Sequence, residues 1–98
     1  MKFSITSFLN SNKCTVELEN FHFHNGIDGF LHSLCDHSDD CNFLDWYQGV
    51  EIGMGHINFK KNPVYVYWTD FPESLSFDFD SVQDAELFKH YLEELNIS

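Results

Sequence analysis

The sequence predicts an α+β fold: a curved antiparallel sheet of about five strands with two helices, in the order β-β-α-β-β-β-α. Three observations support this prediction. Apolar and polar residues alternate along several short segments, as they do in strands with one buried face. Two other segments repeat apolar residues at helical spacing. The 98 residues also include eleven phenylalanines, four tyrosines and two tryptophans, so a single domain over 1–98 can bury an aromatic core.

The N-terminal part is expected to form a hairpin followed by a helix. Residues 2–9 and 14–19 each begin with alternating apolar and polar side chains, and a turn-forming Asn-Ser-Asn cluster separates them. The apolar positions shift by one residue after Asn20, which indicates a bulge or bend there. Apolar residues then recur at helical spacing over 27–35, and Asn25 can act as the N-cap of that helix.

The middle of the chain predicts one further strand. Residues 43–48 fit either a helical turn or a strand, and their pattern does not decide between the two. Residues 49–60 alternate as a strand does, but their apolar positions change parity at Gly55 and His56. A glycine makes a bulge easy, so a bulge is expected at that point. Two bulges in one small sheet predict strong curvature, because bulges bend strands and increase their twist.

The segment Pro63–Asp80 has the clearest strand pattern and predicts a β-hairpin. Its apolar positions are Val64, Val66, Trp68, Leu75, Phe77 and Phe79. The positions between them are Tyr65, Tyr67, Ser76, Asp78 and Asp80. Because successive side chains of a strand point to opposite faces, one face of this hairpin is apolar and the other is aromatic and acidic. The second face therefore predicts a binding surface.

The C-terminal segment predicts a helix that packs on the sheet. Ser81 and Asp84 have the spacing of a capping box, in which the serine side chain accepts a hydrogen bond from the first turn. Apolar residues follow at positions 85, 88, 92 and 95, with Tyr91 beside them. This spacing places them on one face of the helix, which is expected to contact the core.

The charge of the chain excludes several classes of partner. Sixteen acidic residues and five lysines, without any arginine, give a formal net charge of −11. Nucleic acids and anionic membranes are bound largely through lysine and arginine, so neither is expected as a partner. A basic protein is the natural complement, because opposite charges steer association and raise its rate. The same charge would also keep a small protein soluble without any partner.

The cysteines and the N-terminus predict a cytoplasmic location. Cys14, Cys35 and Cys41 are an odd number, which cannot all pair within one chain. The N-terminus lacks the apolar run and small-residue cleavage site of a signal peptide. No stretch approaches the roughly 20 apolar residues of a membrane span. The three thiols are therefore expected to be free in a reducing compartment.

A cluster of histidines and cysteines offers an alternative function. Zinc binds tetrahedral sets of nitrogen and sulfur ligands, and residues 22–41 could supply such a set. The candidates are His22, His24, Cys35, His37 and Cys41. Their spacing matches neither a CxxC knuckle nor an HExxH motif, and the chain has no P-loop or nucleophile motif. We expect no metal, no cofactor and no enzymatic activity; a small metal-binding or catalytic domain stays the alternative.

Two acidic surfaces are candidates for binding a basic protein. The first is the second face of the hairpin together with its turn: Tyr65, Tyr67, Asp70, Glu73, Asp78 and Asp80. The other is an acidic segment with Asp39, Asp40 and Asp45. Tyrosine offers apolar area and a hydroxyl with few rotamers to freeze, and carboxylates accept bidentate hydrogen bonds from arginine. The first surface requires that its tyrosines face solvent; if the helices cover them, the acidic segment is the expected site.

The stretch VYVYWTDFPESLSFDFDSVQDAELF, residues 64–88, resembles bacterial toxin-immunity proteins, including the immunity partners of contact-dependent growth inhibition systems. The resemblance covers at most the C-terminal third of the chain and carries no residue role over to it. In that class an acidic protein typically covers the active site of a basic nuclease toxin domain, which implies the same function here. A phage-type inhibitor that mimics nucleic acid, or a structural subunit of a complex, would share the acidic composition.

Overall fold

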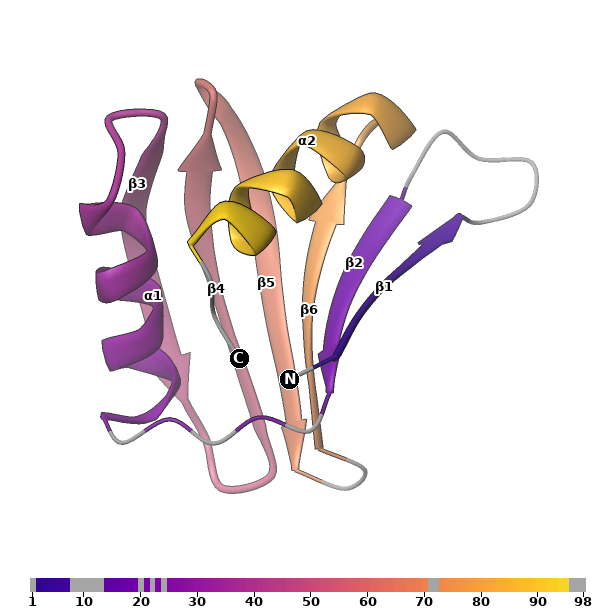
Figure 1. Cartoon of the computed structure of the whole chain (residues 1–98). Helices are drawn as coiled ribbons and strands as arrows, with labels where there is room; N and C mark the ends of the chain where they lie inside the picture. Colours follow the sequence, from indigo (N-terminus) through magenta and orange to yellow (C-terminus); the bar gives the residue numbers. More distant parts are fainter. Residues whose placement is uncertain are drawn as a thin grey trace.

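The computed structural model of the chain describes residues 2–7, 14–19, 21, 23, 25–70 and 73–95. Within these residues the elements are β1 (Lys2–Ser7), β2 (Cys14–Glu19), α1 (Gly26–Asp36), β3 (Cys41–Gln48), β4 (Ile52–Phe59), β5 (Asn62–Asp70), β6 (Glu73–Phe79) and α2 (Val82–Glu94). The described strands form one antiparallel sheet in the order β1-β2-β6-β5-β4-β3 (Figure 1). The predicted class, an antiparallel sheet with two helices, is confirmed.

The described part of the chain has six strands rather than about five, in the order β-β-α-β-β-β-β-α. The additional strand is β3, whose sequence pattern did not distinguish a strand from a helical turn. It lies at one edge of the sheet and pairs only with β4, and its register shifts between Phe43 and Asp45. Because this irregularity interrupts the alternation of apolar and polar side chains, the strand has no clean period of two.

The prediction of a bulge at Gly55 and His56 is wrong. β4 pairs with β5 in an unbroken register, and its buried and exposed positions alternate regularly from end to end. Gly53 and Gly55 occupy buried positions, whereas the apolar side chains of Ile52 and Met54 lie on the exposed side. The change of parity in the sequence therefore marks apolar residues on the outer face, not an inserted residue. The expected curvature stays a prediction, since Asn20, the other inferred bulge, lies outside the described residues.

The glycines of β4 make room for a tryptophan of the edge strand. A Cβ atom on Gly53 would lie 2.6 Å from Cζ2 of the Trp46 indole. A Cβ atom on Gly55 would meet the backbone of Asp45 and lie 2.9 Å from the indole Cε3. The indole Nε1 donates to Gln48 Oε1 at 3.1 Å. Only glycine permits this close approach, which explains why two glycines occupy the buried positions of a central strand.

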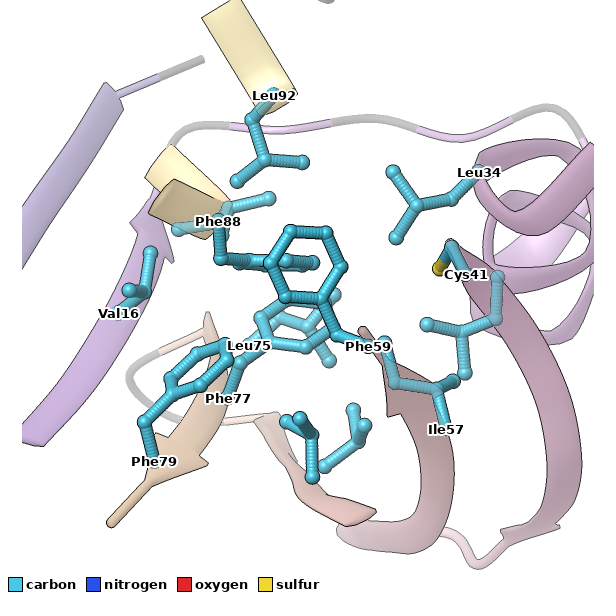
Figure 2. Packing of buried hydrophobic residues seen from close by; sticks show 14 of the residues in the cluster. Val16, Leu34, Cys41, Ile57, Phe59, Leu75, Phe77, Phe79, Phe88 and Leu92 are labelled. Atoms are coloured by element: carbon cyan, nitrogen blue, oxygen red, sulfur yellow. The ribbon is translucent and has the colours of Figure 1, made fainter. Parts of the chain in front are cut away.

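Both helices lie on the same side of the sheet (Figure 1). α1 packs against β3, whereas α2 packs across β1, β2 and β6. The core between the helices and the sheet is aromatic, and Phe88 of α2 lies at its centre (Figure 2). Its ring centroid is 4.8 Å from that of Phe77 and 5.1 Å from those of Phe59 and Phe79. Neither described helix is long and apolar enough to cross a membrane.

The starts of the two helices differ. Ser81 caps α2 as predicted: its Oγ accepts a hydrogen bond from the backbone N–H of Asp84 at 3.1 Å. Asn25 occupies the predicted N-cap position of α1, but its side chain makes no capping hydrogen bond. The next residue, Gly26, has a φ of +73°, a backbone conformation that glycine adopts without steric cost. The predicted buried face of α2 is confirmed by Ala85, Phe88 and Leu92.

Candidate functional site: the open face of the sheet

The sheet face opposite the two helices is the candidate site, and we call it the open face. Its described side chains include Thr15, Glu17, Glu19, Asp45, Tyr47, Ile52, Met54, His56, Asn58, Tyr65, Tyr67, Thr69, Ser74, Ser76 and Asp78. Strand parity assigns them to this face, because the intervening residues form the core. Several large side chains on it are exposed: Tyr47 by 65%, Ile52 by 41%, Met54 by 37% and Tyr65 by 36%.

Two tyrosines of β5 form the aromatic centre of this face. The rings of Tyr65 and Tyr67 lie nearly parallel, with centroids 6.4 Å apart and planes 18° apart. The Tyr65 hydroxyl donates to Sδ of Met54 on the neighbouring strand at 3.8 Å. Neither ring is covered by a helix, which was the condition for the hairpin to act as a binding surface. The ring pairing restricts both tyrosines before any partner arrives, and the thioether contact restricts Tyr65 further.

An acidic row crosses the open face at the level of Tyr65. Sheet register aligns Asp45, His56, Tyr65, Asp78 and Thr15 on five neighbouring strands. Nδ1 of the histidine lies 3.0 Å from Oδ1 of Asp45, and the imidazole meets the tyrosine ring edge-on with centroids 5.5 Å apart. At the other end, the threonine Oγ1 donates to Oδ1 of Asp78 at 2.8 Å. The row therefore holds two oriented carboxylates on either side of an aromatic ring.

A second acidic site lies next to this row on β2. Burial raises the pKa of Glu17, and a hydrogen bond with Glu19 and its negative charge raise it further, while a hydrogen bond with Ser74 acts in the opposite direction. A positive charge placed beside the two glutamates would relieve their repulsion and favour the ionised form. The chemistry of this end of the open face therefore also suits a cation.

Four of the residues expected in the partner-binding surface lie on the open face: Tyr65, Tyr67, Asp78 and Asp45. Asp45 was assigned to a separate acidic segment, but the pairing of β3 with β4 brings it into line with the hairpin. Asp70 and Glu73 lie elsewhere, as the paired end residues of the β5–β6 hairpin, and the backbone N–H of Asp70 donates to Glu51 O at 2.9 Å. Asp80 follows β6 and is exposed just before α2.

The remaining acidic candidates lie in the loop between α1 and β3. Asp39 and Asp40 are exposed there, away from the open face. Oδ2 of Asp40 is 3.2 Å from Nζ of Lys60, and the Lys60 backbone N–H donates to the Asp40 carbonyl at 2.6 Å. Lys60 therefore already neutralises the charge of the Asp40 carboxylate. For this reason we expect the segment to attract a basic partner less strongly than the open face does.

Comparison with known proteins finds no matching family model, no significantly similar curated protein and no significantly similar solved structure. The function must therefore be argued from the site.

The alternative metal cluster is only partly covered by the structure. His22 and His24 lie outside the described residues. Among the residues that are described, no group of three or more histidine, cysteine or acidic side chains is placed to hold a metal ion. His37 is exposed after α1, whereas Cys35 and Cys41 contact one another with sulfur atoms 3.0 Å apart.

Sequence reasoning missed several members of the open face, above all Thr15, His56 and Met54. The alternation in 14–19 already placed Thr15 on the polar side of its strand. This alternation does not indicate that the strand pairs with β6, which places Thr15 opposite Asp78. His56 and Met54 were not predicted on the open face, because the expected bulge placed all apolar residues of β4 on one buried face. Sheet order and strand register were the missing information.

Proposed function

We propose that this chain is a non-enzymatic inhibitor that binds a basic protein through the open face. In this proposal its biological role is that of an immunity protein that occludes the active site of a nuclease toxin. The observation that carries the proposal is the row of oriented carboxylates, Asp45 and Asp78, on either side of Tyr65. Exposed aromatic rings between fixed acidic groups are what a protein surface rich in arginine and lysine would complement.

The carboxylates would stand where a nuclease otherwise holds nucleic-acid phosphates. Each carboxylate has two oxygens with about four lone-pair sites, so one hydrogen bond to Thr15 or His56 leaves room for an incoming guanidinium. Those two bonds orient Asp78 and Asp45 in advance, which lowers the entropic cost of binding. Tyr65 and Tyr67 would supply the packed centre of the interface, where aromatic residues carry most of the binding energy.

The long-range charge supports the same partner. The whole chain carries a formal net charge of −11, and the described side chains of the open face include four acidic residues. A field of this sign accelerates encounter with a basic surface and repels nucleic acid that competes for it. The proposal therefore predicts that electrostatics act chiefly on the rate of association.

We expect association with the basic partner to slow about tenfold or more when salt is raised to about 0.5 M, because the Debye length then falls to a few ångströms. The partner is first captured from host extract with the tagged chain, and the two rate constants are then measured with purified proteins by surface plasmon resonance. The dissociation rate should change much less, since packed tyrosines are insensitive to salt. If neither rate constant responds to salt, electrostatic capture is wrong.

A further inference from the structure

Two thiols lie in contact at the junction of α1 and β3, away from the open face. Cys35 belongs to the last turn of α1, and Cys41 is the first residue of β3. Their Sγ atoms are 3.0 Å apart, about 1 Å more than the roughly 2.05 Å of a disulfide bond. We propose that Cys35 and Cys41 are a modification site: they form a reversible intramolecular disulfide when the protein meets a low-molecular-weight disulfide such as oxidised glutathione.

The two thiols differ in access and in acidity. Cys35 is half-buried and can be reached from solvent, whereas Cys41 is only 2% exposed. The hydrogen bond from Cys41 lowers the pKa of Cys35, and the same hydrogen bond together with burial raises the pKa of Cys41. Because the thiolate is the nucleophile in disulfide exchange, Cys35 attacks first and Cys41 completes the reaction.

The reaction proceeds in two exchange steps. The Cys35 thiolate attacks one sulfur of the oxidant, which forms a mixed disulfide and releases one small-molecule thiolate. Cys41 then gives up its proton to solvent and attacks Sγ of Cys35, which forms the intramolecular bond and releases the second small-molecule thiolate. The two cysteines lose two electrons and two protons in total, and the oxidant is reduced to two thiols.

The surrounding contacts hold both thiols in place during these steps. The Tyr91 hydroxyl donates to the carbonyl of Leu34, next to Cys35, at 2.6 Å. The backbone N–H of Cys41 donates to Ser38 O at 3.3 Å. Burial raises the pKa of Tyr91 to about 12, and the negative charges that Cys41, Cys35 and Asp40 carry when ionised add to the effect, so this hydroxyl keeps its proton to a higher pH than an ordinary tyrosine does. The disulfide would close the short acidic loop between α1 and β3 without moving either element far.

The test uses the reduced wild-type protein. It is incubated with oxidised glutathione, quenched with an alkylating reagent, digested and analysed by mass spectrometry. We expect a peptide pair cross-linked through Cys35 and Cys41, which dithiothreitol separates. The oxidised protein should melt about 5–10 °C higher, because the cross-link removes conformational freedom from the unfolded chain.

Two variants make the result specific. Cys14→Ala should still form the cross-link, because β6, β5 and β4 separate β2 from β3 in the sheet. Cys41→Ala should stop at the mixed disulfide of Cys35 with glutathione. The inference is overturned if Cys35 and Cys41 of the wild type are both still alkylated when the quenched protein is unfolded in the presence of the reagent. It is equally overturned if the glutathione adduct on wild-type Cys35 persists, or if the cross-link contains Cys14. None of these readouts depends on the basic partner.

Discussion

Replacing Phe88 with alanine is expected to lower the free energy of unfolding by about 3–5 kcal/mol, the usual cost of removing a large buried aromatic ring. Phe88 is completely buried, and its ring contacts three aromatic rings from two strands: Phe59 of β4, and Phe77 and Phe79 of β6. No single neighbour can fill the space, because these rings are also fixed by the sheet. The loss would be a large share of the roughly 5–15 kcal/mol that stabilises a typical domain.

The matched control is Leu87→Ala at the preceding position of α2. Leu87 is 40% exposed, so its truncation should cost about 1 kcal/mol or less. Urea unfolding followed by circular dichroism measures both variants against the wild type. Similar losses for the two substitutions would show that α2 does not pack on the sheet through the Phe88 face.

The second large effect is expected on binding. Asp78→Lys should weaken affinity for the basic partner about 100-fold, because a buried interfacial charge pair is replaced by two like charges. Asp78 lies in the middle of the open face, between Thr15 on β2 and Tyr65 on β5. The substitution removes the acceptor of the Thr15 hydrogen bond, but its site is exposed, so the variant should remain folded.

Glu86→Lys is the control for charge alone. Glu86 is exposed on α2, on the helix side of the sheet, and its reversal changes the net charge by the same amount as Asp78→Lys. We expect an effect of about threefold or less, from the weaker overall field. Isothermal titration calorimetry gives both affinities. Equal losses of affinity for the two variants would mean that the partner is attracted by the net charge of the chain and does not bind the open face specifically.

Much of the fold follows from local signals in the sequence. The cap at Ser81, the buried face of α2 and the alternation of Val64, Val66 and Trp68 depend on neighbouring residues only, and each is found as predicted. β3 was undecided because a register shift interrupts its pattern. The bulge predicted at Gly55 was wrong because the glycines of β4 leave room for Trp46, which belongs to another strand. No local pattern in the sequence reveals such a contact.

The candidate site was predictable only within one hairpin. The alternation of Tyr65, Tyr67 and Asp78 predicts an aromatic and acidic face from the sequence alone. The residues that orient its carboxylates, Thr15 and His56, come from β2 and β4 and join it through sheet order. Sequence parity gives the face of each strand but not the neighbour of each strand, so the row across the sheet required three-dimensional information.

The central claim is that the basic partner binds the open face. It is tested most directly by comparing the NMR signals of the tyrosine rings with and without the bound partner. Three of the four tyrosines, Tyr47, Tyr65 and Tyr67, lie on the open face, whereas Tyr91 lies on the helix side and donates to Leu34. In protein labelled with isotopes at tyrosine, the account predicts that the signals of Tyr65 and Tyr67 shift on binding and that the Tyr91 signal does not. A shift of Tyr91 with unchanged signals from the three open-face tyrosines would contradict it.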